Sequence, residues 1–239
     1  MNNSSDNKGK KILGYLFPGL ITLLVMLIVL AAKGIWPFGS SRIDLFDNMQ
    51  QVAPLYAHLW DAMHGDASIW FDWYTGLGTN VSMSMSAFSM ISPFNLFLYL
   101  CPRDYILEFI SVLTVIKTFV MSVTMYAFIN KRYNSLSYNI KALFAVAYAF
   151  CGYVLLYASC FTPWMDIVAL FPLLMMALDV MEKTGKKLFY IIMVAVMFII
   201  NYYLAAMSLV YILLVGGMYL IFMCDKKERR GKAWNVGIG

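Results

Sequence analysis

Long apolar runs, separated by short polar or basic stretches, dominate the chain. A membrane-spanning helix needs roughly 20 apolar residues, and six runs approach that length. They cover residues 12–32, 105–130, 140–159, 165–181, 188–206 and 207–223, and the boundary between the last two falls around Asn201 or slightly later. The first run is longer than the core of a cleaved signal peptide, which spans about 7–15 residues, so it predicts an uncleaved anchor. The pattern predicts an all-α membrane protein with about six transmembrane helices.

These runs divide the chain into five parts. They are a cytoplasmic N-terminus (1–11), a first transmembrane helix (12–32), a large outer loop with amphipathic or interfacial helices (33–104), five further transmembrane helices (105–223) and a cytoplasmic tail (224–239). In this arrangement fourteen of the eighteen Lys and Arg residues fall on the inner side, three on the outer side, and Lys117 within a span. Cytoplasmic segments of membrane proteins carry such an excess, so both termini are predicted to be cytoplasmic.

Composition supports a membrane protein. Only 13% of the residues are charged and 62% are hydrophobic, whereas soluble domains carry about 25% charged residues. The net charge of +5 comes from short clusters between apolar runs, which form no continuous basic face for a nucleic acid. The lipid bilayer is therefore an expected partner and nucleic acid is not. The four cysteines show no spacing typical of a disulfide framework or a zinc site.

Residues 43–64 of the outer loop show helical periodicity. An apolar stripe recurs at steps of three and four residues, and polar residues fall on another face. The stripe consists of Leu45, Met49, Val52, Tyr56, Leu59 and Met63, and the polar face of Asp44, Asp47, Gln51 and His58. We expect an amphipathic helix on the outer membrane surface, bent near Pro54.

Asp44 and Asp47 have two interpretations. Aspartate favours the N-cap of a helix, and acids in the first turn complement the helix dipole. A carboxylate on the outer face also suits a general base toward a sugar hydroxyl, or a ligand of a divalent metal ion. Spacing alone leaves both interpretations open.

An aromatic cluster at residues 70–74 precedes a Gly76-x-Gly78 turn. Tryptophan and tyrosine are enriched where membrane meets water, and their rings also stack on sugars. The cluster therefore suits either an aromatic belt or a sugar contact. The apolar segment 88–101 is too short to span, so it predicts a re-entrant or interfacial helix.

An ordered set of motifs resembles the bacterial YfhO membrane-protein family. The motifs are Asp47-x-x-x-Gln51-x-x-Pro54, Gly76-Leu77-Gly78-x-Asn80, Ser92-Pro93-Phe94-Asn95-Leu96, Pro163-Trp164-x-Asp166 and Asn201-Tyr202-Tyr203. The resemblance implies a glycosyltransferase of the GT-C type in the bacterial plasma membrane. Such an enzyme takes a sugar from a polyprenyl-phosphate donor and transfers it to an envelope polymer such as lipoteichoic acid.

The resemblance also assigns roles. The resemblance implies that a carboxylate of the first outer loop serves as catalytic base or as a group that positions the acceptor, a role that falls first to Asp47 and second to Asp44. The expected substrate-binding residues are Gln51, His58, Asn80, Lys117, Trp164, Asp166, Asn201 and Tyr202. Lys117 has two interpretations, a contact to the donor phosphate or a structural pair with another charge, because an unpaired Lys within a span costs about 2.5–3.5 kcal/mol on insertion scales.

Length separates the chain from that family. Its members are several times longer, so the chain is expected to be an N-terminal part, truncated or split. Two other functions stay open from the sequence: a transporter or permease subunit, and a non-catalytic membrane remnant.

Overall fold

The computed structural model describes residues 3–43 and 45–222, and within them helices joined by turns are the main regular structure. The longer helices are α1 (Asn3–Ala32), α4 (Ile106–Arg132), α5 (Tyr138–Ala149), α6 (Gly152–Cys160), α7 (Met165–Thr184), α8 (Leu188–Ile200) and α9 (Tyr202–Phe222). The described residues contain two isolated bridges and no named strand. The predicted all-α membrane class is therefore confirmed.

Four helical stretches are long and apolar enough to cross a membrane. They are Ile12–Ala32, Arg103–Arg132, Tyr138–Cys160 and Thr162–Thr184, and two shorter apolar helices cover Leu188–Ile200 and Tyr202–Met218. Each predicted run thus coincides with apolar helix. The predicted run 140–159 is interrupted between α5 and α6, because Cys151 adopts an extended backbone. The last two runs separate at Asn201, which is extended as well.

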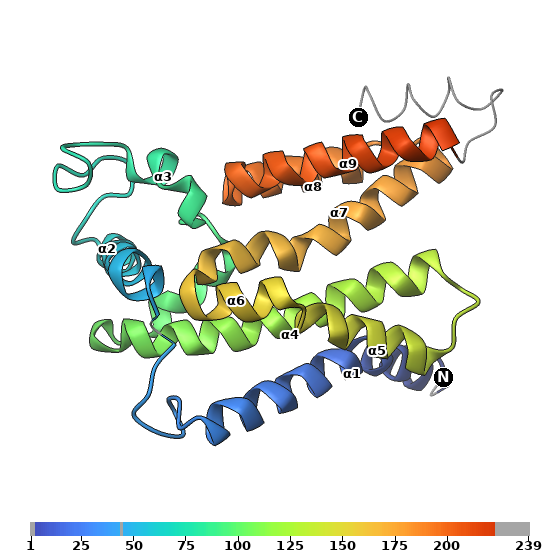
Figure 1. The fold of residues 1–239 in the computed structure, drawn as a ribbon, viewed down its shortest axis with the longest axis horizontal. Coiled ribbons are helices and arrows are strands. Elements are labelled where there is room, and N and C mark those ends of the chain that lie inside the picture. The colour runs from blue at the N-terminus through green and yellow to red at the C-terminus, as the bar shows by residue number, and fades with distance from the viewer. Residues whose placement is uncertain (1–2, 44, 223–239) are drawn as a thin grey trace.

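The two ends of the molecule differ. The helices run back and forth, so that segment 33–104 gathers at one end, here called the loop end (Figure 1). The turns 133–137 and 185–187 lie at the opposite end, here called the turn end. The basic residues that flank these turns, Lys131, Arg132, Lys183, Lys186 and Lys187, therefore lie away from segment 33–104.

Helix α4 lies at the centre and packs against α1, α5 and α7. Gly19 lets α1 approach closely, because a Cβ atom there would lie 2.7 Å from Val123 and 2.8 Å from Phe119. At the turn end, Asp179 of α7 pairs with Arg132 of α4 at 3.0 Å and with Lys183 at 2.8 Å. The helices are thus joined by close packing and by ion pairs at the turn end.

The predicted helix 43–64 begins later than expected. A π-helical turn, η1 (Asn48–Val52), leads into α2 (Ala53–His64). Pro54 lies in the first turn of α2, where the missing N–H of a proline costs no helical hydrogen bond. The α-helix therefore starts next to Pro54, and the bend expected at Pro54 is not present.

The predicted apolar stripe packs mainly on protein. Val52, Tyr56 and Leu59 are buried in one cluster with residues of α4, whereas Leu45 and Met49 are exposed. The remaining short elements of the loop end are α3 (Val81–Ser84), η2 (Ser86–Phe88), η3 (Pro93–Leu100), η4 (Arg103–Tyr105) and η5 (Thr162–Trp164). The first part of α2 thus fixes the loop onto the helices below it.

Candidate functional site

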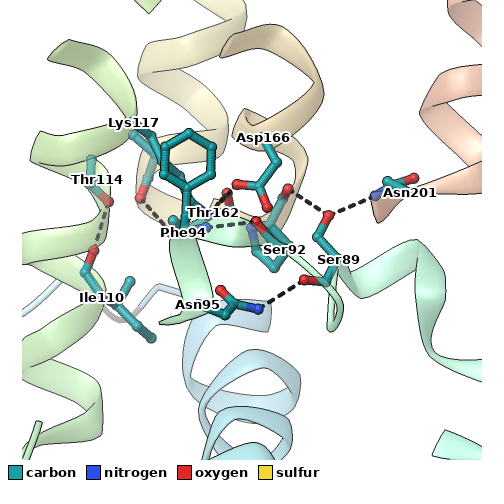
Figure 2. Close-up of polar contacts among 12 residues, drawn as sticks. Ser89, Ser92, Phe94, Asn95, Ile110, Thr114, Lys117, Thr162, Asp166 and Asn201 are labelled. Carbon is teal, nitrogen blue, oxygen red and sulfur yellow. Dashed lines mark hydrogen bonds and ion pairs between the residues drawn. The ribbon is translucent and has the colours of Figure 1, made fainter. Parts of the chain in front are cut away.

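A buried ion pair lies beneath the loop end (Figure 2). Lys117 Nζ of α4 lies 2.6 Å from Asp166 Oδ1 of α7, and both side chains are fully buried. Lys117 also donates a hydrogen bond to the carbonyl of Thr162 at 3.1 Å, and its ammonium lies 5.8 Å from the centre of the Phe94 ring. Two charges inside a protein need such close pairing. Of the two interpretations of Lys117, the structural pair describes this structure.

Segment 86–95 covers the pair with further hydrogen bonds. The Ser89 hydroxyl donates to the Pro163 carbonyl at 2.9 Å, and Asn95 Nδ2 donates to the Ser89 carbonyl at 2.8 Å. Asn201 Nδ2 donates to Ser89 Oγ at 3.1 Å and to the Ala87 carbonyl at 2.7 Å. The structure thus brings together the motifs around Asn95, Pro163 and Asn201, which lie far apart in the sequence.

Ser92 adds another contact from this segment. Its hydroxyl accepts a hydrogen bond from the backbone N–H of Phe94 at 3.2 Å, which caps η3. The same hydroxyl lies beside the Asp166 carboxylate (Figure 2). Ser92 therefore links the start of η3 to the buried pair.

Asn48 fastens η1 to the turn between α6 and α7. Its Nδ2 donates to the Ser159 carbonyl at 3.0 Å, and its Oδ1 accepts from the backbone N–H of Thr162 at 2.9 Å. The side chain is fully buried. Sequence reasoning missed Asn48 and Ser89. Asn48 adjoins the motif residue Asp47, which was a usable signal, whereas Ser89 is one of several serines in its segment.

Asp47 lies next to this anchor and is partly exposed. Its Oδ1 accepts a hydrogen bond from Gln51 Nε2 at 2.6 Å. It occupies the N-cap position of η1 but makes no side-chain capping bond to the helix that follows, so capping of Asp47 is limited to its place at the helix start. The preceding Phe46 has a left-handed backbone (φ +49°), an uncommon conformation for a residue with a side chain. Asp44 lies outside the described residues.

Three other predicted residues have local roles at the loop end. The His58 ring nitrogen Nε2 lies 3.1 Å from the Ser68 carbonyl, within hydrogen-bond distance. Asn80 Oδ1 accepts from the Met83 backbone at 3.0 Å and from the Ser82 hydroxyl at 2.8 Å, which caps α3. Tyr202 is exposed at the start of α9.

Trp164 lies among aromatic rings. Its ring centroid is 4.8 Å from that of Tyr157, 5.0 Å from Phe161 and 5.8 Å from Tyr203. Its indole N–H is buried and has no hydrogen-bond partner within the described part of the chain. A donor of this kind is usually satisfied, so Trp164 is available to a polar group that enters from outside.

A cavity of about 730 Å³ lies between the loop end and the end of α8. Most of its lining side chains are apolar, including Leu59, Ile69, Met90 and Ile199. None of the predicted site residues lines it, but several neighbours or partners of them do. These are Ser68, Ser82, Ser92 and Ile200, which contact or adjoin His58, Asn80, Asp166 and Asn201.

Electrostatics at the loop end involve two more groups. Arg103 donates two hydrogen bonds to Asp61, at 2.6 and 2.9 Å, and this contact lowers the pKa of the Asp61 carboxyl. Burial, and to a lesser degree the Asp166 carboxylate, raises the pKa of the Tyr56 hydroxyl well above its usual value. That hydroxyl has no hydrogen-bond partner among the described residues. Tyr56 is thus a neutral hydroxyl held near the buried pair.

Metal ligands do not cluster in the part of the chain that the structure describes. No group of three or more His, Cys, Asp or Glu side chains gathers there. Asp47 faces Gln51, and Asp166 faces Lys117. The polar groups of the candidate site are therefore carboxylates, amides and hydroxyls.

Comparison with known proteins identifies the family of the chain. The family model described as "Bacterial membrane protein YfhO" matches residues 19–238, which is most of the chain. No curated protein and no solved structure matches it. The family match covers both segment 33–104 and the helices whose residues meet at the buried pair, so the chain belongs to the bacterial YfhO membrane-protein family.

Proposed function

We propose that the chain forms the donor-binding and base-bearing part of a membrane glycosyltransferase of the bacterial plasma membrane. The donor is a polyprenyl-phosphate sugar, and the acceptor is a polymer of the cell envelope such as lipoteichoic acid. The observation that carries the proposal is the position of Asp47, a partly exposed carboxylate beside the buried Asn48 anchor. Catalytic groups gain from being held in place by buried hydrogen bonds.

The apolar cavity supports the choice of donor. Its walls include Val196 and Ile199 of α8, and Ile199 is exposed toward the surroundings of the helices. An isoprenoid chain needs an apolar path of this kind, whereas its phosphate stays near water. The cavity also reaches Ser92, which lies beside Asp166. A lipid-linked donor in the cavity would therefore extend its head group toward the motif residues.

The reaction needs one proton acceptor. An acceptor hydroxyl oxygen forms a bond to the anomeric carbon while the bond from that carbon to the phosphate oxygen breaks. Asp47 takes the hydroxyl proton and Gln51 orients its carboxylate, while polyprenyl phosphate leaves with the electron pair. General-base assistance of this kind is worth about 10²–10⁴-fold in rate. Asp44 is the second candidate for the base.

The other substrate-binding candidates divide by burial. His58, Asn80, Trp164 and Tyr202 are proposed to contact the substrates directly, because each is at least partly accessible. The remaining three are Lys117, Asp166 and Asn201, which are buried. These three are proposed to hold the floor of the site.

Substitution of Asp47 tests the proposal. Membranes containing the Asp47→Asn chain should transfer labelled sugar from a polyprenyl-phosphate donor to polymer at least about 100-fold more slowly than wild type. The matched control is Asp66→Asn, an exposed carboxylate of the same segment. EDTA in the same assay tests a divalent-metal requirement. Unchanged transfer by Asp47→Asn would refute the proposal.

A transporter or permease subunit is the second candidate function. Helix interruptions at Cys151 and Asn201 and the buried Lys117–Asp166 pair favour it, because transporters place broken helices and polar groups within the membrane. In proteoliposomes this function predicts movement of intact donor lipid between leaflets, blocked by Lys117→Met and unaffected by Asp47→Asn. Transfer of the sugar to polymer would instead support the enzyme.

A further inference from the structure

Residues 70–79, here called the aromatic turn, form a compact closed turn in segment 33–104. Asp72 and Thr79 exchange two backbone hydrogen bonds, each 3.0 Å long. The Thr75 hydroxyl donates to Asp72 Oδ2 at 2.6 Å. The Asp72 carboxylate therefore helps to close the turn while it stays partly exposed, and the turn has a defined shape.

Several large apolar side chains of the turn are largely exposed. Trp70 is 67% exposed, Trp73 73%, Tyr74 98% and Leu77 98%. Such a gathering of exposed aromatic groups is unusual on a soluble surface and marks an interaction site. A suitable ligand is one that stacks on the faces of these aromatic rings.

The Trp73 ring is held in a fixed position. Gly78 has a left-handed backbone (φ +100°), and a Cβ atom there would lie 3.1 Å from the Trp73 ring and 3.2 Å from Phe71. Phe71 and Trp73 contact each other edge to face with centroids 4.9 Å apart. The indole thus rests on the turn with most of its surface open, and little side-chain freedom is lost when a ligand stacks on it.

The place of the turn argues against burial in a bilayer. Figure 1 shows the loop between α2 and α3 beyond the loop ends of α1 and α8. The 21-residue apolar stretch of α1 is as long as a bilayer core is thick and ends short of the turn, whereas the 30-residue stretch that contains α4 is longer, and its start reaches about as far as the loop. We therefore place the turn outside the apolar core. The aromatic belt expected from composition belongs at the helix ends.

Charge narrows the class of ligand. Residues 70–79 contain no Lys or Arg and one acid, Asp72. The Thr75 hydrogen bond lowers the pKa of the Asp72 carboxyl, so this group is an anion at neutral pH that accepts hydrogen bonds. A phosphate or a nucleic acid needs cations that the turn lacks. A neutral saccharide offers C–H faces for the indole and hydroxyl donors for the carboxylate.

We propose that the aromatic turn binds a saccharide chain, with Trp73 as the stacking platform and Asp72 as the hydroxyl acceptor. The identification of this chain as an uncharged saccharide part of the acceptor polymer rests on the proposed function, whereas saccharide binding itself does not. The phosphate groups of such a polymer would lie away from the turn. Trp70 also lines the apolar cavity. A polymer held on the turn therefore lies next to the place where a lipid-linked donor would present its sugar.

The test uses the full chain in lipid nanodiscs and two neutral probes, cellohexaose and chitohexaose, in titration calorimetry. Wild type should bind at least one probe saturably. Trp73→Ala should weaken that binding about tenfold, the scale of one lost aromatic contact, and Trp73→Phe should lose less. Tyr99→Ala is the control, because Tyr99 is also an exposed aromatic group of segment 33–104 but lies in η3. Absence of saturable binding by wild type, or equal binding by Trp73→Ala and wild type, overturns the proposal.

A fluorescence measurement tests the competing bilayer contact. The difference in emission between wild type and Trp73→Phe reports on Trp73, and aqueous iodide should quench it more than brominated lipids do. Stronger quenching by brominated lipids would overturn the proposal. Neither the calorimetric nor the fluorescence measurement contains the lipid-linked donor, so both are independent of sugar transfer. If the protein transfers sugar but does not bind the saccharide probes, only this inference is refuted. Saccharide binding without sugar transfer refutes only the proposed function.

Discussion

Replacing Lys117 with methionine removes one charge from the buried pair with Asp166. The two charged atoms lie 2.6 Å apart and neither side chain is exposed, so no water reaches the carboxylate that is left. Lys117→Met also removes the hydrogen bond to the Thr162 carbonyl. Loss of one partner from a buried pair typically costs about 3–5 kcal/mol, and we expect a decrease in unfolding free energy of that size.

The companion variant separates pairing from packing. Asp166→Asn leaves an unpaired ammonium and should cost a similar amount. The double variant Lys117→Met/Asp166→Asn leaves no unpaired charge at this position, so its cost should fall well below the sum of the two single costs. A coupling free energy of about 2 kcal/mol or more is expected, because contacting residues are not additive.

Unfolding in mixed micelles of increasing SDS fraction, followed by circular dichroism, measures these differences. Lys183→Met is the matched control, since Lys183 is half-exposed and its partner Asp179 keeps a second partner, Arg132. An exposed pair contributes about 0–1 kcal/mol. If Lys117→Met costs no more than Lys183→Met, or if the two single costs add, the reasoning about the buried pair is refuted.

Three further predictions concern other contacts at the loop end. Asn48→Ala leaves a backbone N–H buried without its acceptor, which costs about 1–3 kcal/mol, and hydrogen exchange should quicken in residues 45–52; unchanged exchange contradicts the anchoring role. Asn201→Ala removes two donated bonds and should lower the unfolding midpoint more than Tyr202→Ala, an exposed neighbour; equal midpoints argue against it. Arg103 lowers the pKa of Asp61 in the folded state, so their contact stabilises the fold above the unfolded-state pKa of about 4 and is lost as the pH falls through the lower folded value. The unfolding midpoint of wild type should therefore fall more steeply below pH 4 than that of Arg103→Gln, and parallel profiles would count against the pair.

Much of the fold follows from hydropathy alone. The bilayer requires apolar helices with internally bonded backbones, so the apolar runs predicted the helices, and the periodicity of 43–64 predicted α2. Two details did not follow. The interruption at Cys151 has no proline to mark it, and the start of the outer helix at Asn48 depends on contacts to Ser159 and Thr162. Both depend on packing between distant segments.

The buried network shows the same limit at the site. Lys117 stood out in the sequence as a charge within a span and Asp166 as a motif residue, yet spacing within one helix cannot reveal a partner on another. Ser89 is one of several serines in its segment, and nothing local distinguishes it until Pro163 and Asn201 lie beside it. The family motifs identified most of the participating segments, and the fold showed that they meet.

Binding of the donor tests the central claim most directly. The purified chain in nanodiscs would be exposed to a polyprenyl-phosphate sugar with a photoreactive group in its lipid part, and the labelled peptides would be mapped by mass spectrometry. We predict saturable labelling, reduced by unlabelled donor, within residues 59–70, 81–82, 90–96 or 196–200, the segments that contain the residues lining the cavity. Absence of saturable labelling, or labelling confined to peptides away from the cavity, would contradict the account.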